Sequence, residues 1–395
     1  MDKHLVLIGA GHIHLYIIKN LKSFTDRNVK VTVIDANEYY YYPAMGAGML
    51  SGMYGPQEIR INVKYLTESN GGEFIEGFVE TIDPDKGDIR LVSGMSLSYD
   101  VLSFNIGSEI DTGSLDVSFF SMFKVKPIHK LFNARCKIMD HLRKRELKIA
   151  VIGGGIAGVE IANHTRQLAD DLKADMNISL ISDKDVLHGF PPGVRQQVME
   201  RMMAHDITLN ENITVKENTK KELFLDDGRI IKYDLAFLAT GTKAPDLFAD
   251  SGLPTGEDRG LLVNTYLQSI RYPEIFGGGD CIAFESSPLI KVGLYDNQQR
   301  RILFHNLLSA LFGERLKAFK PKQDYVKFLD LADGTGILHH KYLKHLKMAG
   351  KLVFKLKHKF DKEFMNQYQL CDELDDIVEW HTGKTLGKQF AIKGK

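Results

Sequence analysis

The chain has 395 residues, of which 44% are hydrophobic and 26% charged, and its formal net charge at pH 7 is zero. This length is enough for two or three domains with full cores, and the neutral balance excludes bulk attraction to nucleic acid, so no nucleic-acid partner is expected. The three cysteines, Cys136, Cys281 and Cys371, are far apart, which argues against a disulfide framework and favours a reducing, cytoplasmic compartment.

No run of the sequence approaches the roughly 18 apolar residues of a membrane-spanning helix. No signal peptide is expected either, because the apolar run that starts at Leu5 indicates a core strand almost at once.

The first motif follows the apolar run 5–8. Gly9 and Gly11 fill the first two positions of a G-x-G-x-x-G pattern, but His14 stands where the third glycine belongs. A helix is expected over 13–21, slightly further from its strand than a glycine would allow.

A second strand is expected over 29–34, with Asp35 at its end. An acidic residue a little over 20 residues after the turn suits a ribose hydroxyl. The other interpretation, a glycine-rich loop with a surface aspartate, is less favoured because strand, turn, helix, strand and acid come in order.

The next stretch is aromatic and glycine-rich, with four tyrosines at 39–42 and glycines between 46 and 52. It could wrap a flat heterocycle or be a loop with aromatic anchors, and the residues leave both open. Strands of a small sheet are expected over 74–83, 88–92 and 99–105, and the last of them runs into a small-residue turn at Gly107.

The second copy of the glycine motif is complete. The strand 148–152 is followed by Gly153, Gly155 and Gly158, and a helix is expected over 156–172. Its N-terminus would direct free N–H groups and the positive dipole end at a phosphate. One such motif is weak evidence, but two copies in one chain strongly indicate two dinucleotide-binding units.

Two more elements of the second unit are expected. A helix over 128–145 precedes the motif, and a strand over 177–182 follows the motif's helix. Asp183 could bind an adenosine ribose, but Lys184 follows it, so the choice between NADH and NADPH is weakly specified. Further strands are expected over 213–215, 222–225, 229–232 and 233–238, and the last leads to Gly241 in an echo of the turn at Gly107.

After residue 260 the chain should return to the first unit. A last strand, expected over 275–280, ends in a glycine loop at Asp280, and a helix is expected over 293–312. An aspartate at such a strand end can accept a hydrogen bond from a sugar-like polyol.

The tail is basic and amphipathic. Residues 338–368 carry two acids and eight lysines, at positions 341, 344, 347, 351, 355, 357, 359 and 362. Leu352, Leu356, Phe360 and Phe364 recur every fourth residue, which predicts an apolar stripe on a basic helix. The helix could lie on an anionic membrane, on the inner face of the cell membrane, or dock on the protein's own core, and both interpretations stay open.

Together these residues resemble the flavoproteins with two dinucleotide-binding domains, the pyridine nucleotide-disulfide oxidoreductase superfamily. Within it the chain is similar to the branch of type II NADH dehydrogenases and sulfide:quinone oxidoreductases, and most similar to flavoproteins associated with selenide, water dikinase. The matching residues, from the first turn to the tail, are His12, His14, 48–50, Gly52, Tyr54, 125–128, 279–281, 291–293, Gln299, Asn306 and 360–365.

The resemblance implies an α/β fold with two Rossmann-like domains, the second inserted in the first, and a C-terminal α-rich tail. Residues 1–125 and 256–330 would bind FAD, 126–255 would bind NADH or NADPH, and 331–395 would form the tail. The FAD-binding residues implied are Gly9, Gly11, His12, Asp35, Met49, Gly107 and Asp280, and those for NAD(P)H are Gly153, Gly155, Gly158, Asp183 and Gly241.

The implied activity is hydride transfer from nicotinamide to flavin and electron delivery to a quinone-like acceptor. Glu160 would orient the amide or handle a proton, and Lys126, Lys291 and Gln299 are the other candidate catalytic residues. A homodimer stays open, and no metal site is expected.

Cysteines are where the chain departs from the family pattern. It has no two close cysteines after the first flavin loops, and no evident pair of the kind that sulfide:quinone oxidoreductases need. A sulfur- or selenium-linked flavoprotein is therefore the second hypothesis, and a flavin-binding sensor without efficient turnover is the third.

Overall fold

The computed structural model describes residues 3–142, 146–289, 291, 293, 295–322, 326–340 and 348–369. Cys371, the acidic stretch 372–379 and three of the tail lysines, at 341, 344 and 347, lie outside the described residues. The chain divides into two compact units, and each is described by itself.

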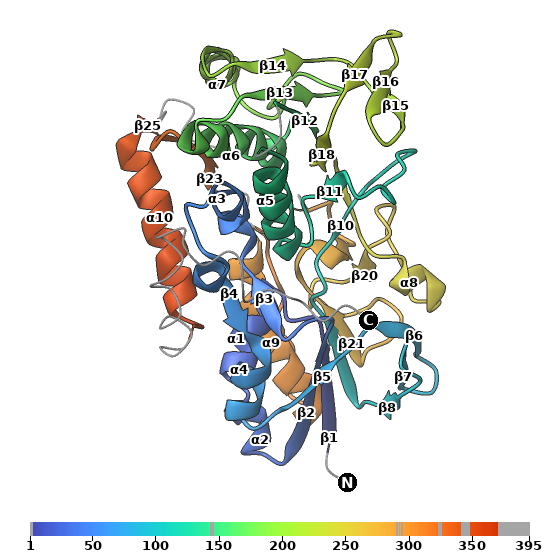
Figure 1. Ribbon diagram of the computed structural model, residues 1–395. Coiled ribbons are helices and arrows are strands. Elements are labelled where there is room, and N and C mark those ends of the chain that lie inside the picture. Colours follow the sequence, from blue (N-terminus) through green and yellow to red (C-terminus); the bar gives the residue numbers. More distant parts are fainter. Residues whose placement is uncertain are drawn as a thin grey trace. The chain divides into compact units, whose positions relative to one another are not determined.

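Unit 1 consists of residues 1–40, 62–111 and 242–325. Its centre is a five-stranded parallel sheet in the order β21-β9-β1-β2-β5 (Figure 1). The strand β1 (Lys3–Ile8) is the middle one, and Leu5, Val6 and Leu7 are fully buried there. Such an uninterrupted apolar run is what a parallel strand covered on both faces requires.

The remaining elements of unit 1 surround this sheet or extend from it. The helices are α1 (His12–Lys19), α2 (Lys22–Thr25), α4 (Val63–Ser69), α8 (Leu247–Asp250), α9 (Asp296–Phe312) and the 3-10 turn η3 (Gly279–Cys281). The strands are β2 (Val29–Asp35), β5 (Glu73–Glu76), β6 (Val79–Asp83), β7 (Asp88–Leu91), β8 (Ser96–Ser98), β9 (Val101–Phe104), β10 (Glu109–Ile110), β19 (Thr242–Lys243), β20 (Leu261–Val263), β21 (Ile275–Gly277) and β22 (Ile282–Phe284).

Unit 2 consists of residues 41–61, 112–241 and 326–395. A second five-stranded parallel sheet has the order β11-β18-β12-β13-β14, again with the strand before the glycine motif, β12 (Leu147–Ile152), in the middle. The helix α6 (Ile156–Leu172) has the bounds that the sequence predicts. The two parallel sheets confirm the expected α/β class with two Rossmann-like halves.

The other elements of unit 2 follow. The helices are η1 (Pro43–Met45), α3 (Gly46–Ser51), η2 (Pro56–Ile59), α5 (His129–Leu142), α7 (Pro192–Ala204) and α10 (Lys351–Asn366). The strands are β11 (Met122–Lys124), β13 (Met176–Ile181), β14 (Ile207–Asn210), β15 (Val215–Asn218), β16 (Glu222–Leu225), β17 (Ile230–Lys232), β18 (Leu235–Leu238), β23 (Val326–Asp330), β24 (Gly336–His340) and β25 (Met348–Gly350), while β3 (Tyr39–Tyr41) and β4 (Arg60–Asn62) stand at the unit boundaries.

Some predicted elements differ from those observed. The stretch 74–83 forms two strands in different sheets, because the chain breaks at Gly77 between β5 and β6. Residues 213–214 are not a strand, and the pairing with β16 starts only at Val215. The helix expected from residue 293 begins at Asp296.

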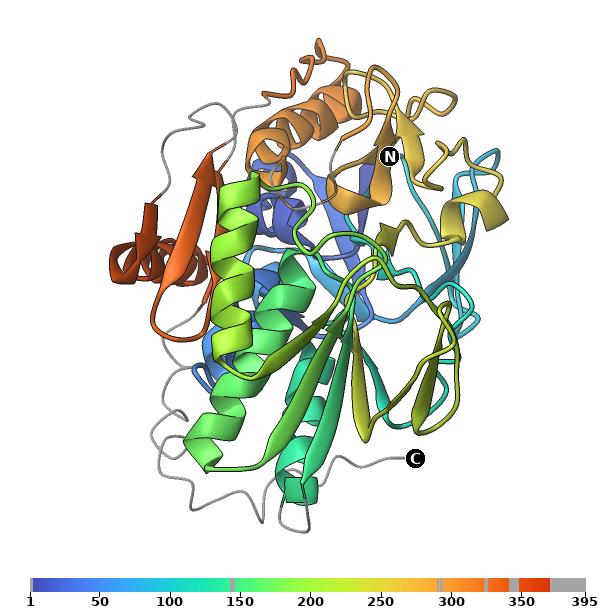
Figure 2. The ribbon, with the colours of Figure 1, turned by 90° about the horizontal axis from the view of Figure 1, so that it is seen from above.

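The tail differs most from its prediction. The α-rich tail that the resemblance implies also contains strands: residues 336–340 form β24, the middle strand of an antiparallel sheet in the order β23-β24-β25. The helix α10 packs against this sheet, and Figure 2 shows it in red beside the same strands. The tail therefore adds a small sheet and one helix to unit 2.

The face of α10 that docks includes only part of the predicted stripe. Its buried residues include Val353, Lys357, Asp361 and Phe364, whereas Leu352 is 66% exposed and Phe360 50% exposed. Lys357, one of the eight tail lysines, is therefore buried and not part of a solvated basic face. Of the two interpretations, docking on the protein is confirmed, while part of the apolar stripe stays on the surface.

Candidate functional site

In unit 1 the first glycine turn is held by a residue that the sequence analysis did not assign. A Cβ on Gly9 or Gly11 would lie 2.6 Å from the carbonyl oxygen of Asn105, so only glycine fits at this close approach. The Asn105 Oδ1 accepts hydrogen bonds from the N–H groups of Ile13 (2.9 Å) and His14 (3.2 Å), at the start of α1. Asn105 thus fixes the turn and caps the helix.

His14 shows how the turn manages without its third glycine. In unit 2 a Cβ on Gly158 would lie 1.8 Å from the carbonyl oxygen of Gly153, so that helix start tolerates no side chain. In unit 1 the His14 Nδ1 lies 2.5 Å from the equivalent carbonyl oxygen, that of Gly9, and its Nε2 lies 2.9 Å from the Ser103 hydroxyl. Burial lowers the pKa of His14 to about 4, so a neutral ring replaces close packing with a hydrogen bond.

The second turn leaves room for a ligand at one position. A Cβ on Gly155 would meet no atom within 4 Å, whereas a Cβ on Gly153 would lie 2.2 Å from the carbonyl oxygen of Ala239. Packing therefore requires glycine at 153 and 158 but not at 155. Gly155 precedes the first turn of α6, where helix N–H groups face an anion. The space beside it fits the pyrophosphate of a dinucleotide.

The other side of the first turn fits a dinucleotide as well. Asp35, at the end of β2, accepts a hydrogen bond from the N–H of Ala10 (2.6 Å), and burial raises the pKa of this carboxyl. Gln299 is buried; its Oε1 accepts from the Gly279 N–H (2.7 Å), while its Nε2 has no partner among the described residues. An orphaned amide beside the Asp280 loop is a donor that a bound cofactor would satisfy.

The remaining candidates divide between the units. Gly107, Asp280, Gln299 and Lys291 lie in unit 1 with the first turn, and the Lys291 Nζ is 2.9 Å from Asp258 Oδ2. In unit 2 lie Lys126, Met49, Asp183 and Gly241. Met49 is buried in α3, which packs on α6, and Asp183 is exposed just after β13.

Glu160 stands in a cluster of charged groups within unit 2. Its Oε1 accepts a hydrogen bond from the N–H of Asp330 (2.9 Å). The Lys357 Nζ donates to Asp361 Oδ2 (2.8 Å) and to the Ala44 carbonyl oxygen (2.9 Å). Burial is the largest effect on Glu160 and raises its pKa, against the opposing charge of Lys357. A carboxyl with a raised pKa can carry a proton.

Lys357 is the counterion that makes this burial tolerable. Burial acts to lower the pKa of Lys357, but the carboxylates of Asp361 and Glu160 outweigh it and the pKa is raised. The lysine therefore stays charged beside its acids, as a buried ion pair requires.

Sequence reasoning missed four members of this cluster, namely His164, Asp330, Lys357 and Asp361. A signal was present: Glu160 and His164 on α6, like Lys357 and Asp361 on α10, stand four residues apart and so share one helix face. In each helix the polar pair interrupts a buried apolar face, which is where a buried polar cluster belongs.

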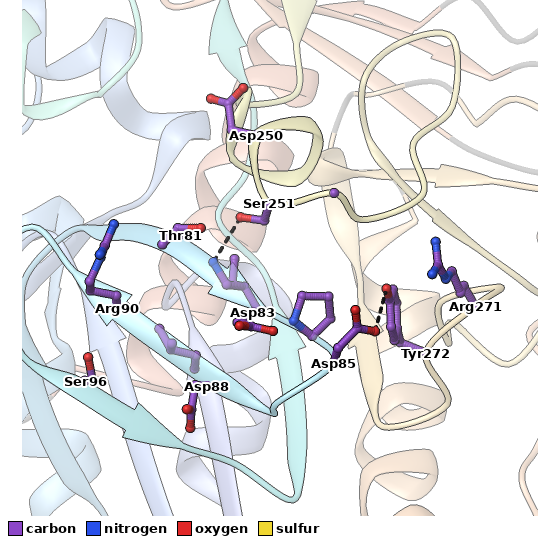
Figure 3. A pocket seen from close by; sticks show the side chains of 14 residues that line it. Thr81, Asp83, Asp85, Asp88, Arg90, Ser96, Asp250, Ser251, Arg271 and Tyr272 are labelled. Atoms are coloured by element: carbon purple, nitrogen blue, oxygen red, sulfur yellow. Dashed lines mark hydrogen bonds between the residues drawn. The ribbon is translucent and has the colours of Figure 1, made fainter.

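A separate cavity of about 560 Å³ in unit 1 is lined by none of the predicted site residues (Figure 3). Carboxylates of Asp83, Asp85 and Asp88 surround it, with the Tyr272 hydroxyl donating to Asp85 at 3.3 Å. No grouping of His, Cys, Asp and Glu suited to a metal ion occurs in the part of the chain that the structure describes.

Two glycine turns of this kind, each after the middle strand of its own parallel sheet, define a protein with two dinucleotide-binding folds. The chain belongs to the pyridine nucleotide-disulphide oxidoreductase family, whose model matches residues 3–302. This confirms the superfamily that the sequence resemblance indicates.

Several known proteins are similar over most of the chain. A probable NADH dehydrogenase of Dictyostelium discoideum is 23% identical and aligns with 85% of this chain and 79% of its own length. The type II NADH:quinone oxidoreductase of Haemophilus influenzae is 24% identical and aligns with 89% of this chain and 90% of its own length.

Among solved structures, NDH2 of Plasmodium falciparum in complex with NADH superposes with a TM-score of 0.78 at 14% identity, covering 93% of this chain and 99% of that one. The sulfide:quinone oxidoreductase of Aquifex aeolicus superposes with a TM-score of 0.77 at 18% identity, covering 93% of this chain and 91% of that one. These likenesses establish the shared fold.

Proposed function

We propose that the protein is an FAD-dependent NAD(P)H oxidoreductase that passes electrons to a quinone-like acceptor. The observation that carries the proposal is the pair of glycine turns, one of which keeps open space beside Gly155 where a pyrophosphate would lie. Relatives named as NADH dehydrogenases and quinone oxidoreductases, aligned over most of the chain, support the choice of acceptor.

The two turns have distinct proposed roles. Unit 1, with Gly9, Gly11, Asp35 and Asp280, would hold FAD, which when bound supplies the two-electron chemistry. Unit 2, with Gly155 at the start of α6, would hold NADH or NADPH. The domain boundaries predicted from sequence stay proposals.

Glu160 is the proposed proton-handling residue. Its carboxyl is partly buried and burial raises its pKa, which favours the protonated form that a proton donor needs. Gln299 is a positioning residue in this proposal, because its Oε1 holds the Gly279 N–H. Lys126 and Lys291 remain candidates for stabilising negative charge on the reduced cofactor.

Steady-state oxidation of NADH with a water-soluble quinone tests this function. We expect the purified, FAD-loaded protein to turn over many equivalents of NADH, and Glu160→Gln to lower kcat by about 100-fold, the usual contribution of a general acid. A flavin-loaded protein that oxidises no more than one equivalent would instead support the sensor hypothesis.

The sulfur-linked hypothesis receives less support. Cys281 is buried, and its Sγ lies 3.3 Å from the Gly278 carbonyl oxygen; burial raises the pKa of this thiol to about 12, so it is inert at neutral pH. Cys136 is in the other unit, and in the described residues neither unit contains two cysteines. The finer kinship with flavoproteins associated with selenide, water dikinase rests on the matching residues named in the sequence, from His12 to the tail pattern 360–365, and stays a proposal.

Peripheral membrane contact is a further part of the proposal. No helix in the described ranges is both long and apolar enough to cross a bilayer. The surface of α10 still presents Leu352 and Phe360, with exposed lysines at 351, 355, 359 and 362. Exposed apolar side chains flanked by lysines suit binding to an anionic lipid surface. A lipid-soluble quinone would be reached at such a surface.

Vesicle sedimentation checks this contact. We expect the protein to bind anionic vesicles at low salt and to dissociate as salt screens the lysines. The double variant Leu352→Glu/Phe360→Glu should weaken binding by about 100-fold, because two apolar side chains no longer enter the lipid. Phe78→Glu/Val92→Glu, at 65% and 68% exposed positions of unit 1, is the matched control and should bind normally. Equal binding by both double variants would exclude α10 as the contact.

A further inference from the structure

The adenosine end of the nucleotide site in unit 2 is left open by the function proposed above. NADH carries a hydroxyl at the 2′ position of its adenosine ribose, and NADPH carries a phosphate there. In a Rossmann-like unit this ribose meets the residue at the end of the second strand, where an acid selects the hydroxyl and a nearby cation admits the phosphate. The residue at this position therefore decides which nucleotide unit 2 can accept.

Strand pairing identifies the position by comparison of the two units. In unit 1, Asp35 directly follows the residue of β2 that pairs with the end of β1. In unit 2 the corresponding pair is Ile152 of β12 with Ile181 of β13, and Ser182 directly follows it. One backbone hydrogen bond of 2.8 Å, from the first glycine of the motif to the second strand, closes each turn in the same way. Ser182, rather than Asp183, is the counterpart of Asp35.

The side chains at the two positions lie against the same point of their glycine turns. In unit 1 the Asp35 Oδ2 accepts a hydrogen bond from the N–H of Ala10, the residue between the first two glycines, at 2.6 Å. In unit 2 the residue between the first two glycines is Gly154, and a Cβ there would lie 2.3 Å from Ser182 Oγ. A neutral hydroxyl thus takes the place of the acid.

This exchange removes the discrimination that a carboxylate provides. A carboxylate accepts hydrogen bonds from ribose hydroxyls, but it repels a 2′-phosphate a few ångström away. Ser182 is 3% exposed, so its effect is to leave the position uncharged rather than to bind the phosphate itself. Unit 2 therefore lacks, at this position, the charge that would exclude NADPH.

Lys184 supplies a cation two residues further on. Its backbone N lies 3.4 Å from Ser182 Oγ, and its carbonyl oxygen lies 3.5 Å from the backbone N of Asn212, so the chain at 184 is positioned from both sides. The Lys184 side chain is exposed just beyond the end of β13. An ammonium group at this place can pair with a phosphate.

Two acids close to Lys184 in the fold are paired with an arginine. The Arg195 Nη1 lies 3.0 Å from Asp185 Oδ2, and its Nη2 lies 3.4 Å from Glu211 Oε1. The exposed side chains of Asp183 and Lys184 carry opposite charges. These side chains together therefore put little net negative charge in the way of a phosphate.

We propose that unit 2 accepts NADPH as well as NADH, with dissociation constants within about tenfold of each other, because Ser182 leaves the ribose position uncharged and Lys184 pairs with the 2′-phosphate. The inference deepens the proposed function and rests on it. Ser182 takes in this proposal the ribose position for which Asp183 is the candidate from sequence. The hydride is the same in both nucleotides, so only binding distinguishes them.

Calorimetric titration of the FAD-loaded protein with NAD⁺ and with NADP⁺ tests the proposal without turnover. In wild type the two Kd values should lie within about tenfold. Ser182→Asp should weaken NADP⁺ binding by about 100-fold and leave NAD⁺ within about threefold, because the new carboxylate repels only the 2′-phosphate. The fold should accept this change, since Asp35 occupies the same position in unit 1. An equal loss of both nucleotides would overturn the proposal.

Lys184→Glu tests the cation at an exposed position and carries the test if Ser182→Asp does not fold. NADP⁺ should bind about tenfold more weakly, with NAD⁺ nearly unchanged, because one charge-assisted contact is lost. Lys148→Glu, at an exposed lysine near the opposite end of β12 from the glycine turn, is the matched control and should change neither affinity. An unchanged NADP⁺ affinity in Lys184→Glu would overturn the proposal.

Asp183→Asn decides between the two ribose candidates. We expect NAD⁺ binding to stay within about threefold of wild type, whereas a loss of about tenfold would show that Asp183 holds the ribose and would overturn the proposal. Wild type that binds NAD⁺ but binds NADP⁺ more than about tenfold more weakly overturns the inference and leaves the proposed function standing. If the FAD-loaded protein binds neither nucleotide, the proposed function falls as well.

Discussion

Replacing Gly155 with leucine is expected to weaken reduction by NADH by about 100-fold while leaving FAD bound. Its φ of −76° suits any residue, and its Cβ meets no protein atom within 4 Å, so the fold should accept the side chain. The side chain would occupy the space of the pyrophosphate. Losing two charge-assisted hydrogen bonds, at about 1.5 kcal/mol each, corresponds to a loss of about 100-fold.

Anaerobic absorbance spectra with added NADH measure this effect, and Gly158→Leu is the contrasting variant. There the Cβ would lie 1.8 Å from the Gly153 carbonyl oxygen, so α6 cannot pack on β12 and the protein should lose its fold. If Gly155→Leu loses its flavin together with reduction by NADH, the two units have been assigned the wrong way round.

Replacing Lys357 with methionine is expected to destabilise unit 2 by about 3 kcal/mol or more, because removing one partner leaves buried charge uncompensated. The side chains of Lys357 and Asp361 are 10% and 6% exposed, so solvent cannot replace the lysine. Denaturant unfolding monitored by circular dichroism measures the loss.

The neutral double variant Lys357→Met/Asp361→Leu is the control for that result. It removes both charges of the pair and should recover most of the stability, although the Ala44 carbonyl oxygen loses its donor. Unchanged stability in the single variant would mean that Asp361 and Glu160 are protonated in the native state and that Lys357 is not their counterion.

The sequence predicted the elements that carry strong local signals. The observed bounds of α6 agree with the predicted ones. The signal is strong because an apolar strand, three glycines and an amphipathic helix follow one another without interruption. The strand β16 was also predicted at its observed bounds, next to an Asp-Asp-Gly turn. The helix α7 was not predicted, since only Val194, Val198 and Met202 are buried and the stripe is narrow.

The tail and the charged cluster could not be predicted, for a physical reason. Periodicity alone assigns Leu352 and Phe360 to the buried face and Lys357 to the solvated one. The structure reverses this, because Lys357 finds Asp361 on its own helix and acids from α6 and β23, so its burial is compensated. The four-residue spacing within α6 and within α10 is a local signal, but it does not show that the two helices and β23 bring their charges together, because those partners are distant in sequence. Asn105 was missed for the same reason.

The central claim is most directly tested by the visible spectrum of the purified protein under anaerobic conditions, before and after one equivalent of NADH or NADPH. The account predicts a flavin spectrum at the start and rapid loss of the flavin absorbance on addition, with the colour restored by a soluble quinone. A protein that shows no flavin absorbance and gains no thermal stability from added FAD, or a bound flavin that neither nucleotide reduces, would contradict it.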